Sequence, residues 1–155
     1  IAFEDQITRV SVIGLENSLT SLPTIFSTIA KHQINVDIIV QTGTRADKEN
    51  ISFSIKSVAL DETLQVLEDN KTLLGYEAVE SEKGLAKVSI VGAGMISNPG
   101  VAARMFEVLA EEGIQVKMVS TSEIKVSTVV SEPMMVKAVE AFHDAFELSR
   151  PRVRA

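Results

Sequence analysis

A glycine-rich loop, GAGMISNPG at residues 92–100, is the part of this sequence whose residue types best suit the binding of a small molecule. Glycine allows positive φ angles and lets the backbone approach a ligand closely. A helix is expected to start near Val101, and the unpaired N–H groups at a helix start suit a carboxylate. Ser97 and Asn98 add polar side chains nearby. The alternative is a glycine-rich turn with no ligand, which composition alone favours.

The GAG of this loop does not make a dinucleotide-binding fingerprint. That fingerprint needs a third glycine, and Ser97 stands where it would fall after Gly92 and Gly94. It also needs an acidic residue roughly 20 residues further on, at the end of a second parallel strand, and the sequence lacks one there. A Rossmann-type nucleotide site is therefore excluded.

A second polar stretch, STSEI at residues 120–124, ends one expected strand and begins the next. A catalytic serine here would need a histidine and an acid that orients it. The two histidines, His32 and His143, are expected on helices and have no partners at metal-ligand spacing. The sequence holds no cysteine, which excludes disulfides, thiolate metal sites and cysteine nucleophiles. We expect a polar turn here, with no catalytic group and no metal site.

The composition is that of an ordinary folded protein. Of 155 residues, 45% are hydrophobic and 23% are charged, which argues against disorder. The net charge is -6 and the Lys and Arg residues are scattered, so the basic stripe typical of nucleic-acid binding is missing. No apolar run reaches the ~18 residues that cross a membrane, and no signal peptide precedes the first expected strand. We expect a cytoplasmic protein that binds neither nucleic acid nor membrane.

The chain repeats itself. Residues 9–14 (RVSVIG) recur as residues 87–92 (KVSIVG), and residues 34–42 (INVDIIVQT) recur as residues 114–122 (IQVKMVSTS). Such self-similarity indicates duplication of one structural unit. We therefore predict two domains, residues 1–82 and residues 83–155.

Both copies show the same order of elements. In the first copy, strands are predicted near residues 7–13, 35–42, 51–58 and 76–80, and helices near 21–32 and 61–70. In the second copy, strands are predicted near residues 86–92, 115–120 and 123–130, and helices near 99–112 and 133–146. The order βαββαβ is that of the ferredoxin-like fold, an α+β fold in which two helices cover one face of an antiparallel sheet. A last strand in the second copy is weakly supported, because RPRVRA at residues 150–155 is short and basic.

The second predicted helix of the first copy has an expected N-cap and an expected buried face. Asp61 is the expected N-cap of the helix at residues 61–70, with Glu62 in its first turn. The buried face of this helix is expected to comprise Leu64, Val66, Leu67 and Leu73.

Several segments of the sequence resemble a known protein family. Residues 92–106 (GAGMISNPGVAARMF) and 120–127 (STSEIKVS) resemble the second ACT domain of bacterial aspartate kinases. Residues 34–41 (INVDIIVQ) and 51–54 (ISFS) resemble the first ACT domain. The resemblance covers essentially the whole chain and is strongest to the lysine-sensitive aspartokinases of Gram-positive bacilli.

The resemblance implies two tandem ACT domains that regulate aspartate kinase and perform no chemistry themselves. In this family the region forms part of the catalytic α chain and is also made separately as a β subunit. The implied partners are a second copy, paired through ACT domains, and the catalytic α subunit in an α2β2 assembly. The sequence shows no phosphoryl-transfer machinery, so we expect the chain to be inactive alone. No cofactor is expected.

The implied role is feedback inhibition of aspartate-family amino-acid biosynthesis by a bound end product. Lysine is the first choice of effector. Threonine, or lysine and threonine together, is the alternative. A second alternative is a structural module that only holds chains together.

In the family, a loop of one ACT domain faces the second strand of its partner, and effectors bind between them. The effector site implied here contains Met95, Ser97, Asn98, Gly100, Val101, Ala102, Ser122 and Glu123, together with Asn35, Val36 and Asp37. A second effector site would contain Leu15, Thr20, Gln41, Thr42, Gln115 and Val116. The family commonly has Asp-x-Pro-Gly in its first ACT loop, whereas Leu19 and Thr20 stand at the Pro-Gly position here.

The charges favour lysine at the first of these sites. A helix start can hold the effector's carboxylate, and Asn35 with backbone carbonyls can hold its α-ammonium. Asp37 is the expected partner of the second ammonium group, with Glu123 as the alternative. The position of the second copy that matches Asp37 holds Lys117, which would repel lysine. The second site is therefore expected to be weak, empty or specific for a neutral ligand.

Overall fold

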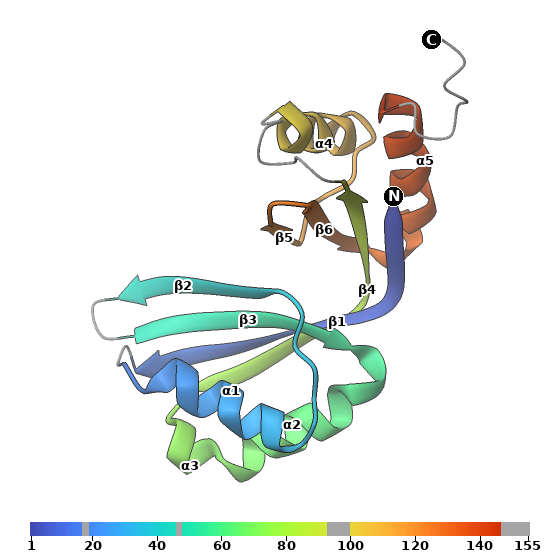
Figure 1. The fold of residues 1–155 in the computed structure, drawn as a ribbon. Coiled ribbons are helices and arrows are strands. Elements are labelled where there is room, and N and C mark those ends of the chain that lie inside the picture. The colour runs from blue at the N-terminus through green and yellow to red at the C-terminus, as the bar shows by residue number, and fades with distance from the viewer. Residues whose placement is uncertain (17–18, 46–47, 93–99, 147–155) are drawn as a thin grey trace. The chain divides into compact units, whose positions relative to one another are not determined.

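The computed structural model describes residues 1–16, 19–45, 48–92 and 100–146 (Figure 1). The chain divides into two compact units. The first unit is Gln6–Lys83, and the second unit combines Ile1–Asp5 with Gly84–Ala155. The hydrogen-bonded strand order is β2-β3-β1-β4-β6-β5, and the long strands β1 and β4 contribute to both units.

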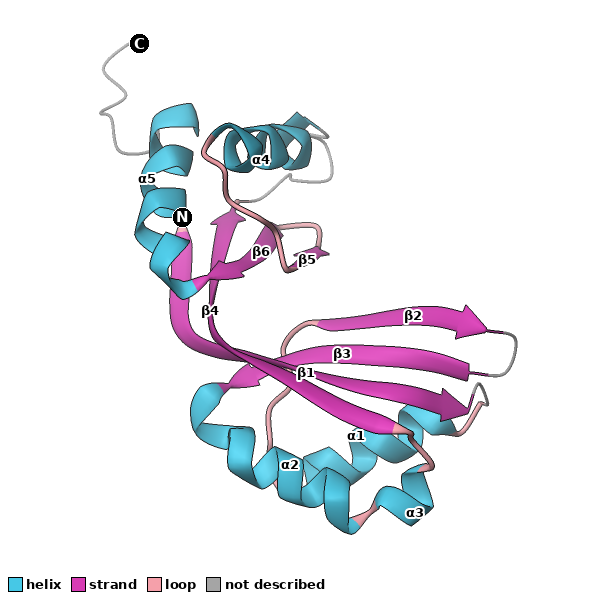
Figure 2. Cartoon of the chain, turned by 180° about the vertical axis from the view of Figure 1, so that it is seen from behind, coloured by secondary structure: helices cyan, strands magenta, loops and turns pink. Residues whose placement is uncertain are grey.

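The first unit has the predicted βαββαβ order. Its elements are β1 (Ala2–Glu16, from Gln6 onward), α1 (Ser21–Lys31), β2 (Ile39–Arg45), β3 (Lys48–Lys56), the 3-10 turn η1 (Ser57–Ala59), α2 (Leu60–Asp69), α3 (Lys71–Leu74) and the first part of β4 (Ala78–Val91). β3 pairs antiparallel with both β1 and β2. The helices lie on one face of the sheet (Figures 1 and 2). The predicted ferredoxin-like arrangement with antiparallel pairing is confirmed in this unit.

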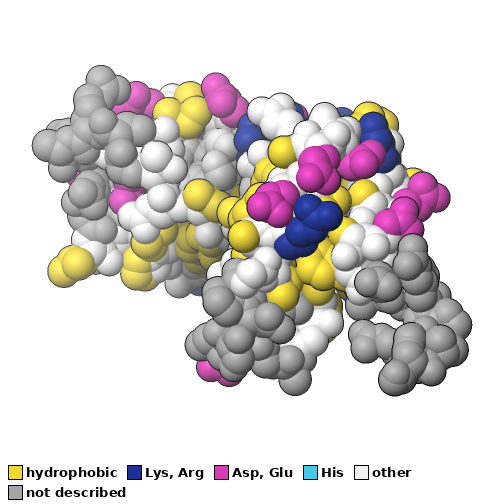
Figure 3. Space-filling view, turned by 90° about the horizontal axis from the view of Figure 1, so that it is seen from above, with side chains coloured by type: hydrophobic (Ala, Val, Ile, Leu, Met, Phe, Trp, Pro, Cys, Tyr) yellow, Lys and Arg dark blue, Asp and Glu magenta, His cyan; other side chains and the backbone are white. Residues whose placement is uncertain are grey.

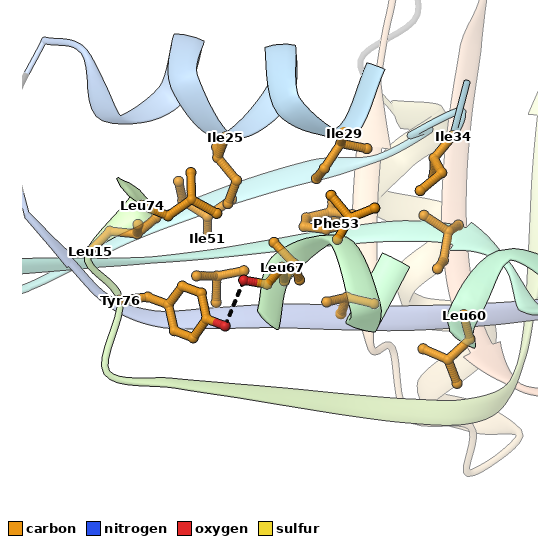
Figure 4. Close-up of a cluster of buried hydrophobic side chains, with 14 residues drawn as sticks. Leu15, Ile25, Ile29, Ile34, Ile51, Phe53, Leu60, Leu67, Leu74 and Tyr76 are labelled. Carbon is orange, nitrogen blue, oxygen red and sulfur yellow. Dashed lines mark hydrogen bonds between the residues drawn. The ribbon is translucent and has the colours of Figure 1, made fainter. Parts of the chain in front are cut away.

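The core of the first unit lies between the sheet and its helices. Strand β3 alternates, so Ile51, Phe53 and Ile55 point inward and are at most 2% exposed. Helix α1 contributes Ile25 and Ile29 (Figure 4). Burying a side chain of this size stabilises the fold by about 1.5–3 kcal/mol.

Two predicted details of the first unit are wrong. Leu73 is 67% exposed, because α2 ends at Asp69 and the separate turn α3 buries Leu74 instead. Asp61 is not the N-cap of α2. The cap is Ala59, and Asp61 lies in the first turn, where its charge still favours the helix dipole.

The second unit repeats the arrangement. Its elements are the rest of β4, α4 (Gly100–Glu111), β5 (Met118–Thr121), β6 (Lys125–Ser131), the 3-10 turn η3 (Glu132–Met134) and α5 (Met135–Phe146). β6 pairs antiparallel with β4 and β5. Val88, Met105, Val130 and Phe142 are buried in its core. Pro133 lies within η3 at the entry of α5.

The start of the chain belongs to the second unit. Ile1 packs against the second core, and Glu4 Oε1 lies 3.7 Å from Lys87 Nζ. The sequence grouped these residues with the first domain, so the compact units differ from the predicted domains at this end. The weakly supported strand at residues 150–155 lies outside the described residues.

The junction between the two sequence copies is a strand. Residues 81–86, which connect the copies, lie inside β4, which runs without a break from Ala78 to Val91. Gly84 has a φ of 71° within this strand. The fourth strand expected at residues 76–80 and the strand expected at 86–92 are therefore one element.

Candidate functional site

The polar stretch after β5 forms a tight turn, as predicted. The Ser122 N–H donates to the Lys125 carbonyl at 2.7 Å, and the Ile124 N–H donates to Ser122 Oγ at 3.4 Å. Ser122 and Glu123 are exposed on this turn. The Gly92 N–H donates to the Ile124 carbonyl at 2.7 Å, so the turn is tied to the residue from which the glycine-rich loop departs.

The other end of that loop is the start of α4. Gly100 is the first residue of this helix and is exposed, and Val101 and Ala102 are half-buried against the second core. Met95, Ser97 and Asn98 were predicted as site residues and lie outside the described residues. Within the second unit, the described part of the predicted site is therefore the start of α4 and the turn at Ser122 and Glu123.

Asn35, Val36 and Asp37 lie in the first unit, in the segment that leads into β2. Val36 is half-buried against the first core, while Asn35 and Asp37 are exposed. The strand was predicted from residue 35 but begins at Ile39. The Ile38 N–H donates to the hydroxyl of Ser54 at 3.0 Å, so this N–H is satisfied by a side chain.

Asp37 and Lys117 occupy the same structural position in the two units. The Asp37 N–H donates to the Ser54 carbonyl at 3.0 Å, and the Lys117 N–H donates to the Val129 carbonyl at 2.7 Å. Ser54 and Val129 match because Arg9 pairs with Ser54 in the first unit, and Lys87 pairs with Val129 in the second. The two copies therefore present opposite charges at one position.

The residues of the second predicted site are spread over both units. Gln41 and Thr42 are exposed on β2, and Thr20 is exposed at the start of α1. Thr20 lines a cavity of about 320 Å³ between α1 and α3. Leu15 has a fully buried side chain in the first core, so only its backbone could face a ligand.

Gln115 and Val116 belong to the second unit, in the segment before β5. Gln115 is exposed, and Val116 is half-buried against the second core. They correspond in sequence to Asn35 and Val36 of the first copy. The predicted site residues at these two positions therefore share one pattern, an exposed amide followed by a core valine.

Sequence reasoning missed two polar residues at this end of the first unit. Glu49 is 3% exposed and accepts a hydrogen bond from Gln41 Nε2. Asn50 Oδ1 accepts from the Gly14 N–H at 3.1 Å, where β1 bulges away from β3. The sequence pattern could have identified Glu49, because it continues the inward alternation of Ile51 and Phe53. The predicted strand begins only at residue 51, so it leaves Glu49 out.

The described residues hold no cluster of His, Cys, Asp or Glu that could bind a metal ion. None of the helices in the described ranges is long and apolar enough to cross a membrane. On the face seen in Figure 3, Lys and Arg side chains lie among Asp and Glu rather than in a continuous basic area. Burial raises the pKa of Tyr76 above its ordinary value of 10.0, and the charge of Glu68 adds to this.

Comparisons with known proteins agree with this geometry. A family model described as "ACT domain" matches residues 88–146, most of the second unit. An aspartokinase from Bacillus sp. (strain MGA3) is 70% identical over 155 residues, which are 100% of this chain and 38% of that protein. The chain thus spans well under half the length of this relative.

Two solved structures match over nearly their whole length. A chain from a crystal structure of aspartokinase alpha and beta subunits has a TM-score of 0.87 and 36% identity, covering 94% of this chain and 96% of that one. The regulatory subunit of aspartate kinase from Thermus thermophilus, in ligand-free form, has a TM-score of 0.86 and 30% identity, covering 94% and 95%.

The fold and the matched residues define an ACT-domain protein. The chain belongs to the aspartokinase family.

Proposed function

We propose that this chain carries two tandem ACT domains and binds free lysine as a feedback effector of aspartokinase. The main support for this proposal is the charge difference at one structural position that the two units share. Asp37 and Lys117 make the same backbone hydrogen bond in their two units, yet only Asp37 can pair with a cationic side chain. A site that includes Asp37 suits lysine, and a site that includes Lys117 repels it.

The proposed lysine site follows from the chemistry of the ligand. The start of α4 supplies N–H groups for the carboxylate at Gly100, Val101 and Ala102. Asn35 and backbone carbonyls take the α-ammonium, and Asp37 takes the ε-ammonium, with Glu123 as the competing carboxylate. The remaining members are Met95, Ser97, Asn98, Val36 and Ser122.

We also propose a second effector site at Leu15, Thr20, Gln41, Thr42, Gln115 and Val116, for a neutral amino acid. The exposed amide of Gln41 and the exposed hydroxyls of Thr20 and Thr42 support this proposal. Threonine is the natural candidate. Concerted control by lysine and threonine would follow if both sites are occupied.

The mechanism would be allosteric. Lysine must bind one arrangement of paired ACT domains better than another, and a coupling of ~1–3 kcal/mol gives roughly 5- to 150-fold inhibition. We propose a homodimer through ACT domains, in an α2β2 assembly with catalytic chains in the cytoplasm. A crystal structure of aspartokinase alpha and beta subunits, one chain of which is 36% identical to this chain, supports this partnership.

A competing function is a purely structural module that holds kinase chains together. The edge strands β2 and β5 at the two ends of the strand order would suit such a role. Calorimetric titration with lysine, threonine and methionine separates the two functions. Lysine heat at millimolar ligand supports the effector site, whereas no heat with any of the three favours the structural module.

A further inference from the structure

A buried carboxylate in the first unit is left unused by the lysine site. Glu49 lies on β3 and is 3% exposed, on the inward side of the strand. Gln41, on the edge strand β2, donates from Nε2 to Glu49 Oε2. In the antiparallel register Gln41 lies opposite Ile51 and Glu49 opposite Gly43, so the bond runs diagonally between neighbouring strands. A buried charge is thereby tied to an exposed amide.

This bond fixes which way the amide faces. An ionised carboxylate can only accept hydrogen bonds, whereas an amide has a donor nitrogen and an acceptor oxygen. Turning the Gln41 amide around would place its oxygen against a buried carboxylate, which is unfavourable for both groups. One N–H of the nitrogen is therefore committed to Glu49, and the acceptor Oε1 is turned away from the carboxylate, so Gln41 can offer this acceptor to a ligand.

We propose that Glu49 is a positioning residue for the second effector site, acting through the orientation of the Gln41 amide. The site then prefers a neutral amino acid whose side chain donates a hydrogen bond, such as threonine. Valine has nearly the same shape but lacks the donor. The inference rests on the proposed function, since Gln41 belongs to the proposed second site, and it adds Glu49 and the side-chain preference.

The second copy shows that this arrangement is particular to the first. Thr121 stands opposite Val126 as Gln41 stands opposite Ile51, so Thr121 is the counterpart of Gln41. The counterpart of Glu49 is Ile124, which is 55% exposed and has no side-chain acceptor. The ferredoxin-like fold therefore does not require a carboxylate at this position.

The test is calorimetric titration of the whole chain with threonine and with valine. We expect the unchanged protein to prefer threonine by roughly five- to tenfold, the effect of one hydrogen bond. In Glu49→Gln the partner amide can pair with Gln41 in either orientation, so the preference should fall to about twofold or less. Gln41→Leu should remove it. In the double variant, Glu49→Gln should change nothing further, because it acts only through Gln41.

Glu77→Gln is the matched control. It removes a carboxylate near the same end of the sheet, where Glu77 lies 4.0 Å from Lys48, and leaves the Gln41–Glu49 bond intact. It should keep the threonine preference. If Glu49→Gln proves unstable, ¹⁵N NMR of the Gln41 side-chain amide in the unchanged protein gives an independent readout. Its two protons should be well separated and slow to exchange.

The outcomes are distinguishable. An unchanged threonine preference in Glu49→Gln, or a Gln41 amide that behaves like a solvent-exposed one, overturns the role of Glu49 and leaves the second site standing. Absence of threonine binding in the unchanged protein overturns the second site and this inference together, while lysine binding would still support the proposed effector function.

Discussion

Asp37 and Lys117 donate their backbone N–H groups to matching carbonyls, at 3.0 and 2.7 Å, in two units that repeat one another. The backbones are alike and the side chains are opposite in charge. An amino-acid effector with a cationic side chain can therefore distinguish the two positions, and the first prediction follows from this difference.

Asp37→Asn should weaken lysine binding roughly tenfold, about 1.4 kcal/mol, and change threonine binding little. The ε-ammonium loses its counter-ion, whereas every backbone contact survives. Titration calorimetry with both amino acids measures this. Lys117→Asp is the companion variant and should leave the lysine site intact. Loss of lysine binding in Glu123→Gln but not in Asp37→Asn would exchange the roles of the two carboxylates.

The chain alone should form a dimer. β2 and β5 end the strand order, and an edge strand offers unpaired N–H and C=O groups to a second copy. Ile39 on β2 is 51% exposed, which adds apolar surface at that edge. Sedimentation velocity at micromolar concentration is the measurement. A stable monomer would argue against pairing through ACT domains.

The chain alone should not phosphorylate aspartate. The chain spans 38% of the length of the aspartokinase that it matches, and it matches nearly the whole of a solved regulatory subunit. A coupled assay with ATP and aspartate should give background rates only. Turnover by highly purified protein would contradict a purely regulatory role.

Gly14→Ala should lower the free energy of unfolding more than Gly84→Ala does. Both glycines have positive φ angles, 77° and 71°, and an added Cβ costs roughly 1–2 kcal/mol for that conformation alone. At Gly14 the Cβ would also lie 2.5–2.8 Å from the side chain of Glu77, whereas at Gly84 it meets nothing within 4 Å. Urea unfolding of the two variants compares the costs, and equal losses would contradict the steric argument.

Tyr76→Phe should lower stability near neutral pH and make it less sensitive to alkali. The variant loses the hydrogen bond from the Tyr76 hydroxyl to the Leu67 carbonyl, 2.9 Å, at a cost of about 1 kcal/mol. Burial raises the pKa of Tyr76 in the folded state above 10.0. The folded protein therefore holds its proton where the unfolded chain has lost it, and this stability disappears as pH rises through the folded pKa. The free energy of unfolding should be measured at about pH 9 and about pH 11. It should decline less between these values in the variant than in the unchanged protein.

The order of elements could be predicted because alternation and helical spacing are local. Ile51, Phe53 and Ile55 identify β3 from the sequence alone, and Ile25 and Ile29 identify α1. The prediction failed where the apolar pattern of one helix continues into the next helix. Leu73 continues the apolar pattern of α2, but the helix ends at Asp69 and the chain turns again before Leu74.

The site was only partly accessible to sequence reasoning. The polar turn at Ser122 could be predicted, because hydroxyls between two strands favour a tight turn. The bond between Gln41 and Glu49 joins neighbouring strands in a particular register, and that register cannot be deduced before the hairpin is known. The segment before β2 depends likewise on the Ser54 hydroxyl of the neighbouring strand β3, which accepts from the Ile38 N–H.

The placement of Ile1–Asp5 with residues 84–155 makes the second unit discontinuous along the chain. The first unit, Gln6–Lys83, is a single uninterrupted segment and can form as soon as it leaves the ribosome. The second unit must bring together two segments with the entire first unit between them. Such distant contacts form slowly, so the second unit should complete its fold after the first.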